Sequence, residues 1–296
     1  MQELFSTARR RRKIIATGYR LLAASLCFYS SFAVAQSCGT PQAGGIARTL
    51  NDAVLFVSPV LNVDADGAPN SYLVDGKGLS YTCDGVVAIE DGKRVTPESD
   101  PQNWQSKCNK AWAQAKASNN YRQVAIFGFQ TDAEKRPIVQ GADDPLPGKA
   151  YVSATSVTIP NAALRTQRQD VDATAIPYIV LPTSFVAKYK VKAGSLAVVY
   201  RKKTGKFSFA VFADGGRLGE ASVKLHQNLG NNPIVKIAGV ERAKVRIEDL
   251  ILTVVFPAEV AVPWADSAEW NSEIQSIGAK ALAIFGGVEK LQACSQ

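Results

Sequence analysis

Two carboxylates, Asp214 and Glu220, stand at the ends of one glycine-rich segment, Gly215–Gly219. Three of its five residues are glycine, which allows the backbone to turn sharply and to approach a ligand closely. A carboxylic acid that protonates a leaving oxygen, with a second carboxylate acting from the opposite face, can hydrolyse a glycosidic bond. The pair is therefore a candidate for acid–base hydrolysis. A simpler interpretation stays open, because Asp before two glycines is common in turns and Glu is common at a helix start.

The lone histidine, His226, adds little to these acids. It lies in a predicted helix, Glu220–Leu229, so a metal centre or a Ser-His-Asp triad would have to use it alone. We expect a partly exposed helix residue rather than a catalytic one. The patterns G-x-G-x-x-G, G-x-x-x-x-G-K-[ST] and G-x-S-x-G do not occur, so the sequence lacks a phosphate cradle and a nucleophile elbow. We therefore expect no cofactor and no metal.

The N-terminus has the features of an export signal. Basic residues at Arg9–Lys13 and Arg20 precede an apolar run of fifteen residues, Leu21–Ala35, which ends in Ala-Val-Ala. Small residues at −3 and −1 mark a cleavage site, so we expect a signal peptide at 1–35 and a single exported domain at 36–296. The domain would be extracellular, or periplasmic where the host has two membranes. An uncleaved membrane anchor is the alternative, because counting back to Ile14 gives about 22 residues.

Removing this segment changes the charge of the protein. The full chain of 296 residues has a formal net charge of +8, and residues 1–35 contain six basic residues and one acid. The remainder has 28 basic and 25 acidic residues, a net charge of +3, which does not favour nucleic-acid binding. The hydrophobic content of 46% indicates a folded globular domain rather than disorder.

Four cysteines follow the predicted signal peptide, which itself contains Cys27. An even number in an exported chain indicates two disulfides, for which three pairings exist. No C-x-x-C pattern points to a redox site or a zinc ribbon. We favour Cys83 with Cys108 and Cys38 with Cys294, because this nested closure ties the two ends of the mature chain together.

Strand signals outnumber helix signals in the rest of the chain. Lys202–Gly205 predicts a hairpin loop between two of the strands, and an acidic loop is expected at Asn62–Asn70. Strands without regular β-α alternation favour a β-rich α+β fold, a barrel or sandwich with peripheral helices. Strands are predicted at Ala53–Val60, Val86–Glu90, Gln123–Gln130, Tyr151–Val157, Tyr178–Leu181, Ser195–Arg201, Lys206–Ala213 and Leu250–Phe256, and helices at Pro101–Ser118, Glu220–Leu229 and Asn271–Phe285.

Three residues of the first predicted helix share one stripe. Trp104, Cys108 and Trp112 are spaced at i, i+4 and i+8, which places them on one face. We interpret the two tryptophans as core residues, and stacking on carbohydrate is the alternative.

Four blocks of the sequence together resemble glycoside hydrolase family 75, the fungal-type chitosanases and their bacterial relatives. The blocks are Asp64–Tyr72, Tyr151–Ser156, Ile176–Pro182 and Phe212–Ser222. They occur in the family's order, and the resemblance extends over most of the mature chain.

The resemblance implies an inverting endo-hydrolase that cleaves β-1,4 bonds in chitosan, the deacetylated form of chitin, without a cofactor. It also implies a core similar to a double-psi β-barrel, with the helices at its periphery. The family's catalytic Asp and Glu match Asp214 and Glu220 through the flanking Phe-Ala-Asp and Leu-Gly-Glu-x-Ser sequences. The segment between the acids is several residues shorter than the family usually has and contains Arg217, which could alter the carboxyl spacing that inversion needs.

The roles of the two acids depend on their surroundings. We expect Glu220 to act as the general acid and Asp214 as the base that activates water. A helix dipole and a nearby guanidinium both favour the carboxylate, so this assignment requires a largely buried Glu220 and an Arg217 that points to solvent. If these conditions fail, the roles should be exchanged.

Binding of a cationic polymer needs local negative charge, because a mature chain of net charge +3 does not attract chitosan. Asp64 and Asp66 are the best candidates, and a simple D-x-D-G turn or a calcium-like loop is the alternative. Thr155 and Tyr178, from two of the blocks, are further candidates for substrate binding. We expect a monomer. The competing functions are a non-catalytic polysaccharide- or wall-binding protein and a hydrolase of another β-1,4 glycan.

Overall fold

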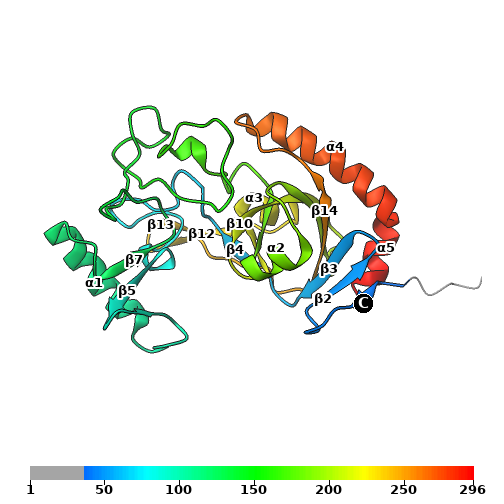
Figure 1. Cartoon of the computed structure of the whole chain (residues 1–296), viewed down its shortest axis with the longest axis horizontal. Coiled ribbons are helices and arrows are strands. Elements are labelled where there is room, and N and C mark those ends of the chain that lie inside the picture. Colours follow the sequence, from blue (N-terminus) through cyan, green and yellow to red (C-terminus); the bar gives the residue numbers. More distant parts are fainter. Residues whose placement is uncertain (1–36) are drawn as a thin grey trace, which may run out of the picture. The chain divides into compact units, whose positions relative to one another are not determined.

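The computed structural model describes residues 37–296 (Figure 1). The predicted signal peptide, residues 1–35, lies outside the described residues. Within the described part of the chain, the fold contains fourteen strands and five α-helices, in agreement with the predicted β-rich α+β class. None of the helices in this part is both long and apolar enough to span a bilayer.

A nine-stranded sheet forms the centre of the fold. Its spatial order is β1-β2-β3-β14-β9-β10-β8-β11-β4. In residues 37–296 these pairings do not close from β4 back to β1, so the double-psi barrel stays a prediction. In chain order, the strands are β1 (Thr40–Pro41), β2 (Ala47–Leu50), β3 (Ala53–Ser58), β4 (Asn62–Asp64), β8 (Tyr178–Leu181), β9 (Ser195–Arg201), β10 (Phe207–Gly215), β11 (Glu220–Ser222) and β14 (Ile251–Val260).

The middle of this sheet forms because its strands are almost continuously apolar. β9 pairs antiparallel with both β10 and β14, and most residues of these strands are buried, including the first six of β14. Such runs are typical of strands that are covered on both faces. The predicted β9–β10 hairpin is confirmed. Helix α4 (Ser267–Phe285) runs along the sheet beside β14 (Figure 1) and packs against β9, β10 and β14. Gly278 lets the helix approach the ring of Phe209 closely.

The other end of the sheet carries the candidate catalytic acids. β10 pairs in parallel with β8, where Asp214 lies opposite Val180. β11 pairs in parallel with β4, where Glu220 lies opposite Asn62 and Ser222 opposite Asp64. The start of the predicted acidic loop is therefore a strand, and two segments about 160 residues apart in sequence become neighbours.

The helix predicted at Glu220–Leu229 is wrong in its first three residues. These residues form β11, and the helix α3 (Val223–Asn228) begins only after Ser222, whose hydroxyl accepts from the Leu225 N–H as its N-cap. The helix begins at its N-cap, Ser222, so the residues before the cap are not helical and can pair with β4 as a strand. His226 in α3 is fully buried, which corrects the partly exposed position expected from the sequence.

A second, smaller core lies in residues 72–151, here named the aromatic region. A three-stranded sheet, in the order β6-β5-β7, packs against helix α1, and both predicted tryptophans of α1 contact this core. The Trp104–Trp112 stripe is therefore core packing, with Trp112 buried and Trp104 half-buried. The elements are η1 (Thr82–Asp84), β5 (Val86–Glu90), β6 (Lys93–Val95), α1 (Trp104–Ser118) and β7 (Val124–Ile126).

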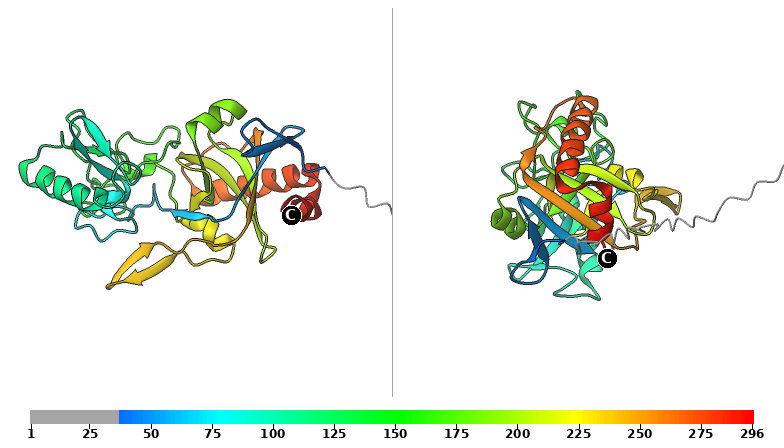
Figure 2. Two further views of the ribbon diagram at one scale, coloured as in Figure 1. Left: turned by 90° about the horizontal axis from the view of Figure 1, so that it is seen from below. Right: turned by 90° about the vertical axis from the view of Figure 1, so that its right-hand side faces the viewer.

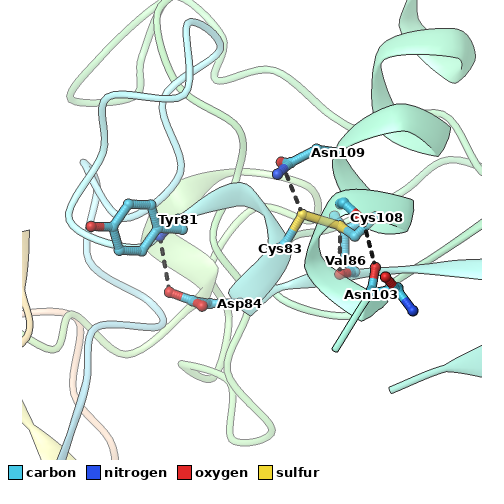
Figure 3. The surroundings of a disulfide bond; sticks show 8 residues. Tyr81, Cys83, Asp84, Val86, Asn103, Cys108 and Asn109 are labelled. Carbon is cyan, nitrogen blue, oxygen red and sulfur yellow. Dashed lines mark hydrogen bonds between the residues drawn. A yellow bond between two sulfur atoms is a disulfide. The ribbon is translucent and has the colours of Figure 1, made fainter. Parts of the chain in front are cut away.

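The disulfide between Cys83 and Cys108 fastens η1 to α1 inside the aromatic region, as Figure 3 shows. Beside it, the carboxylate of Asp84 accepts a hydrogen bond from the Tyr81 N–H. The strand predicted at Tyr151–Val157 is wrong, because this segment makes only isolated bridges, Tyr151 with Val139 and Ser153 with Phe129. Its alternating apolar residues are instead buried among loops.

The remaining elements cover and connect the two cores. Cys38 and Cys294 form the second predicted disulfide and tie the start of the described chain to the last helix. A two-stranded hairpin, β12–β13, projects from the sheet (Figure 2, left), and its Arg242 donates to carbonyls of the aromatic region, including Gly78. These elements are α2 (Thr183–Tyr189), β12 (Ile234–Ile237), β13 (Val240–Ala243), α5 (Gly287–Cys294) and the short η2 (Gln167–Gln169).

Candidate active site

Three aspartates meet at the end of the sheet that contains β4 and β10. Asp64 ends β4, Asp66 follows in the next turn, and Asp214 lies near the end of β10. Each offers one carboxylate oxygen, and these oxygens all lie within 4.8 Å of one another. The sequence predicts both the D-x-D motif and Asp214 as site residues, and the fold brings them together.

Asp214 is buried and firmly held. Its Oδ1 accepts from the N–H and the hydroxyl of Ser156, at 2.7 and 2.8 Å, and from the N–H of Gly215 at 2.7 Å. Burial raises the pKa of Asp214 above its ordinary value, and the charge of Glu220 adds to this, while the three donors oppose the shift. The three donors fix the orientation of the carboxyl group through Oδ1.

Asp64 and Asp66 are half-buried and held by the backbone and by tyrosines. Asp64 Oδ1 accepts from the Asp66 N–H at 2.9 Å, and Asp66 Oδ1 accepts from the Tyr72 hydroxyl at 2.7 Å. Burial raises the pKa of both carboxyls well above the ordinary value, and the charges of Asp214 and of each other raise it further. Because the three carboxylates lie this close, ionisation of one raises the pKa of the others, and they titrate as a coupled group.

Glu220 is half-buried in strand β11, next to this group. Its Oε2 accepts from the Arg217 N–H at 3.0 Å. A Cβ on Gly216 would lie 2.8 Å from that oxygen, and Gly219 has a φ of +84°, so the short loop requires glycine at both positions. The helix start expected at Glu220 is absent, and the dipole argument that depended on it does not apply.

Arg217 points away from the acids. Its guanidinium donates to Glu98 Oε1 at 2.6 Å, and its side chain is 73% exposed. One of the two conditions for Glu220 as general acid is thus met, since Arg217 points to solvent. The other condition is not met, because Asp214 is the more deeply buried acid of the pair.

Thr155 and Tyr178, predicted as substrate-binding residues, lie beneath the acids. The Tyr178 hydroxyl is fully buried with its side chain and donates to the Asp66 carbonyl at 2.8 Å. The Thr155 hydroxyl donates to the Val157 carbonyl and accepts from the Val171 N–H. Both hydroxyls hydrogen-bond to backbone groups of the protein, so these residues fix the backbone around the acids.

His226 lies behind strand β4 rather than in the acid group. Its Nε2 is 3.0 Å from the Asn62 carbonyl oxygen, and its Nδ1 is 3.1 Å from the amide nitrogen of Asn231. A carbonyl at one nitrogen and an amide donor at the other suit the neutral ring. Burial lowers the pKa of His226 to about 4, which keeps the ring neutral. The histidine therefore supports the strand that presents Asp64.

The three aspartates have oxygen ligands of the kind that a hard cation prefers. The same concentration of negative charge suits the ammonium group of a cationic sugar. The donor set fits either ligand on chemical grounds, and the sequence predicts no metal.

Two supporting residues were not singled out from the sequence. Ser156 donates two hydrogen bonds to Asp214, and Tyr72 donates one to Asp66. Each is the last residue of a block that carries the family resemblance, and this position is the only sequence feature that points to them as site residues. Their roles depend on contacts across 58 and six residues, which composition and spacing do not reveal.

Paired carboxylates on two strands of one sheet, β10 and β11 on either side of β8, are the catalytic groups that hydrolysis of a glycosidic bond requires, and burial raises the pKa of one of them, Asp214. The chain belongs to the family described as fungal chitosanase of glycosyl hydrolase group 75, whose model matches residues 61–284. It is thus an enzyme of a chitosanase family, and polysaccharide is its class of substrate. The matched segment contains all four acids of the site. None of the curated proteins compared with the chain matches it.

Proposed function

We propose that the protein is a secreted, endo-acting chitosanase that cleaves β-1,4 bonds with inversion, using Asp214 and Glu220 as its catalytic pair. The observation that carries this proposal is the placement of the two acids on β10 and β11, beside Asp64 and Asp66, with the pKa of Asp214 raised by burial. The family supports the substrate, and the acids support the chemistry.

The surroundings of the two acids favour an exchange of the roles expected from the sequence. Asp214 is buried and its pKa is raised, so it can hold the proton that a leaving oxygen needs. Glu220 is half-buried, and its Oε2 accepts a hydrogen bond from the Arg217 N–H, which orients the carboxyl group to take a proton from water. In this proposal Asp214 is the general acid and Glu220 the base.

Asp64 and Asp66 supply the negative charge that a polycationic substrate requires. The exported part of the chain carries a net charge of +3, so attraction has to be local. Both acids stand beside Asp214, and an ammonium group of a bound glucosamine unit would stabilise their ionised forms. We assign them to substrate binding next to the cleaved bond.

Export is part of the same proposal. Two disulfides in residues 37–296 suit an oxidising compartment, and the N-terminal signal would deliver the chain there. We propose cleavage after Ala35 and a single catalytic domain at 36–296, with the double-psi arrangement of its core as the family-based expectation. N-terminal sequencing of exported protein should begin at Gln36.

The test is hydrolysis of chitosan, with cellulose and peptidoglycan assayed in parallel. Release of reducing ends from chitosan alone is expected, with rapid loss of viscosity because the cuts are internal. NMR of early product should show the α-anomer first, since inversion at a β-bond gives this anomer. Chitosan left intact, with another glycan cleaved, would contradict the substrate, and a first β-anomer would contradict inversion.

A further inference from the structure

A cavity of about 670 Å³ lies beside the candidate active site. Two of its lining residues lead back to the acids: Gly67 follows Asp66, and Asp170 accepts from the N–H of Thr155, the neighbour of Ser156. The volume is within the range of about 300–1,000 Å³ that small-ligand sites occupy. None of the proposed catalytic steps uses this cavity.

Trp264 forms an aromatic wall of the cavity. Its side chain is 50% exposed, whereas Trp112 and Trp270 are buried. Its Nε1–H donates to Glu273 Oε2 on α4 at 2.6 Å, and the loop that carries it leads into Asp266, the N-cap of α4. A large, flat and anchored ring facing a cavity can stack on the apolar face of a sugar.

The cavity is also negatively charged. Four aspartates and one arginine, Arg168, line it. Asp144 and Asp170 accept internal hydrogen bonds on both oxygens. Neither Asp143 nor Asp172 takes part in an ion pair within residues 37–296.

Asp172 is the acid best placed to bind a cation. It is half-buried, and its Oδ1 accepts from both the N–H and the hydroxyl of Thr174 at 2.7 Å, so the carboxylate is oriented before any ligand arrives. Asp143 is exposed at the rim. An oriented carboxylate in a concave, poorly compensated site prefers a positive ligand, and an anionic ligand would be repelled.

We propose that this cavity binds a glucosamine unit of the chitosan chain away from the cleaved bond, with its ring on Trp264 and its ammonium group on Asp172. The choice of a glucosamine unit rests on the proposed function, whereas the cavity, the ring and the acid are independent of it. A neutral sugar could stack on Trp264 but would bring no positive charge to the Asp172 carboxylate.

Calorimetric binding of a glucosamine hexamer tests this assignment. All measurements use the full exported chain with Glu220→Gln, which prevents turnover. Adding Asp172→Asn or Trp264→Ala should weaken binding about tenfold, because each removes a charge-assisted hydrogen bond or a stacking surface. Trp264→Phe should retain most of the affinity. Asp52→Asn, which removes an exposed carboxylate from the β2–β3 turn, is the charge-matched control and should bind like the parent.

A fully N-acetylated hexamer provides the second arm. It should bind more weakly than the glucosamine hexamer and should not respond to Asp172→Asn. Unchanged affinity in both Asp172→Asn and Trp264→Ala, with thermal melting showing folded protein, would overturn the proposal. Equal binding of the two hexamers would overturn ammonium recognition. Failure of the proposed function looks different, because the unsubstituted enzyme would then not cleave chitosan while the binding results stood.

Discussion

The nine-stranded sheet and the aromatic region are stabilised by different interactions. The sheet buries continuous aliphatic strands such as Ser195–Arg201 and needs no cross-link within its middle. The aromatic region has short strands and many loops, and it depends on clustered rings and on the Cys83–Cys108 disulfide. Within it, the rings of Phe129 and Tyr151 stack with centroids 4.7 Å apart.

This difference between the two regions explains which of them carries the catalytic acids and which supports them. Strands of the sheet present Asp214 and Glu220, where the hydrogen-bonded ladder fixes their backbone. The aromatic region contributes a support, the Tyr72 hydroxyl on Asp66. Reacting groups thus lie on the rigid sheet, and the loop-rich region adjusts the acids from one side.

The two disulfides provide the largest expected contrast. The Cys38–Cys294 bridge closes 256 residues and the Cys83–Cys108 bridge closes 25. On the chain-entropy model, replacing the first pair by serine lowers the free energy of unfolding by about 5.5 kcal/mol and replacing the second pair by about 3.5 kcal/mol. Urea unfolding of the oxidised variants measures both losses. A larger loss from the second pair would show that the aromatic region, rather than the sheet, limits stability.

A buried histidine in the sheet region makes stability depend on pH. His226 has a pKa of about 4 in the fold against 6.5 in the unfolded chain. Only the unfolded chain binds this proton between these values, so the contribution is complete above pH 6.5 and is lost as the pH falls towards 4. From pH 7.5 to 4.5 the loss is about 2–3 kcal/mol.

Comparing the stability of a His226→Gln variant at pH 7.5 and pH 4.5 isolates the contribution of His226. Urea unfolding at both pH values should show a smaller pH-dependent loss in the variant, although it is less stable at pH 7.5. Equal losses in the two proteins would mean that other groups account for the acid sensitivity.

Two side-chain hydroxyls donate to the aspartates, that of Tyr72 in the aromatic region and that of Ser156 in the loop segment that follows it, and removing these hydroxyls compares their contributions. Ser156→Ala and Tyr72→Phe should each lower kcat/KM about tenfold, the usual scale for a hydrogen bond to a charged group. Only Ser156→Ala should move the alkaline limb of the pH profile upwards, because it removes a donor that lowers the pKa of the general acid, Asp214. A shift caused by Tyr72→Phe alone would place the acid at Asp66.

The smallest effect is expected from the ion pair that joins the two regions at the surface. Arg217 and Glu98 are 73% and 63% exposed, so solvent screens their attraction. Glu98→Gln should leave the free energy of unfolding nearly unchanged. A larger loss in thermal or urea unfolding would mean that this pair, and not the packed cores, connects the regions.

The sequence predicts the sheet better than the loops for a physical reason. Val86–Glu90, Tyr178–Leu181 and Ser195–Arg201 are strands with the predicted bounds, because each is a continuous run that favours strands by itself. Tyr151–Val157 also contains β-branched and aromatic residues, but Ser and Thr interrupt its apolar run and it lacks a continuous partner strand. Glu220–Ser222 is a strand because β4 and β8 pair with it, and a window of local sequence contains neither partner.

The candidate site was predictable to a similar extent. Asp64, Asp66, Asp214 and Glu220 were selected by residue type, spacing and family resemblance, and the fold places the three aspartates together. Which of the catalytic pair is the more buried could not be predicted, because burial depends on contacts between distant segments. The Ser156 hydroxyl on Asp214 is one such contact, across 58 residues.

The central claim is that Asp214 donates the proton and Glu220 activates water. It is tested most directly by assaying Asp214→Asn and Glu220→Gln on chitosan and on a glucosamine oligomer with an aryl leaving group that needs no protonation. Both folded variants should lose about a thousandfold or more of kcat on chitosan. On the aryl substrate, Asp214→Asn should recover most of its activity, whereas Glu220→Gln should not. Recovery by Glu220→Gln instead would reverse the roles, and near-normal turnover of chitosan by both variants would contradict the account.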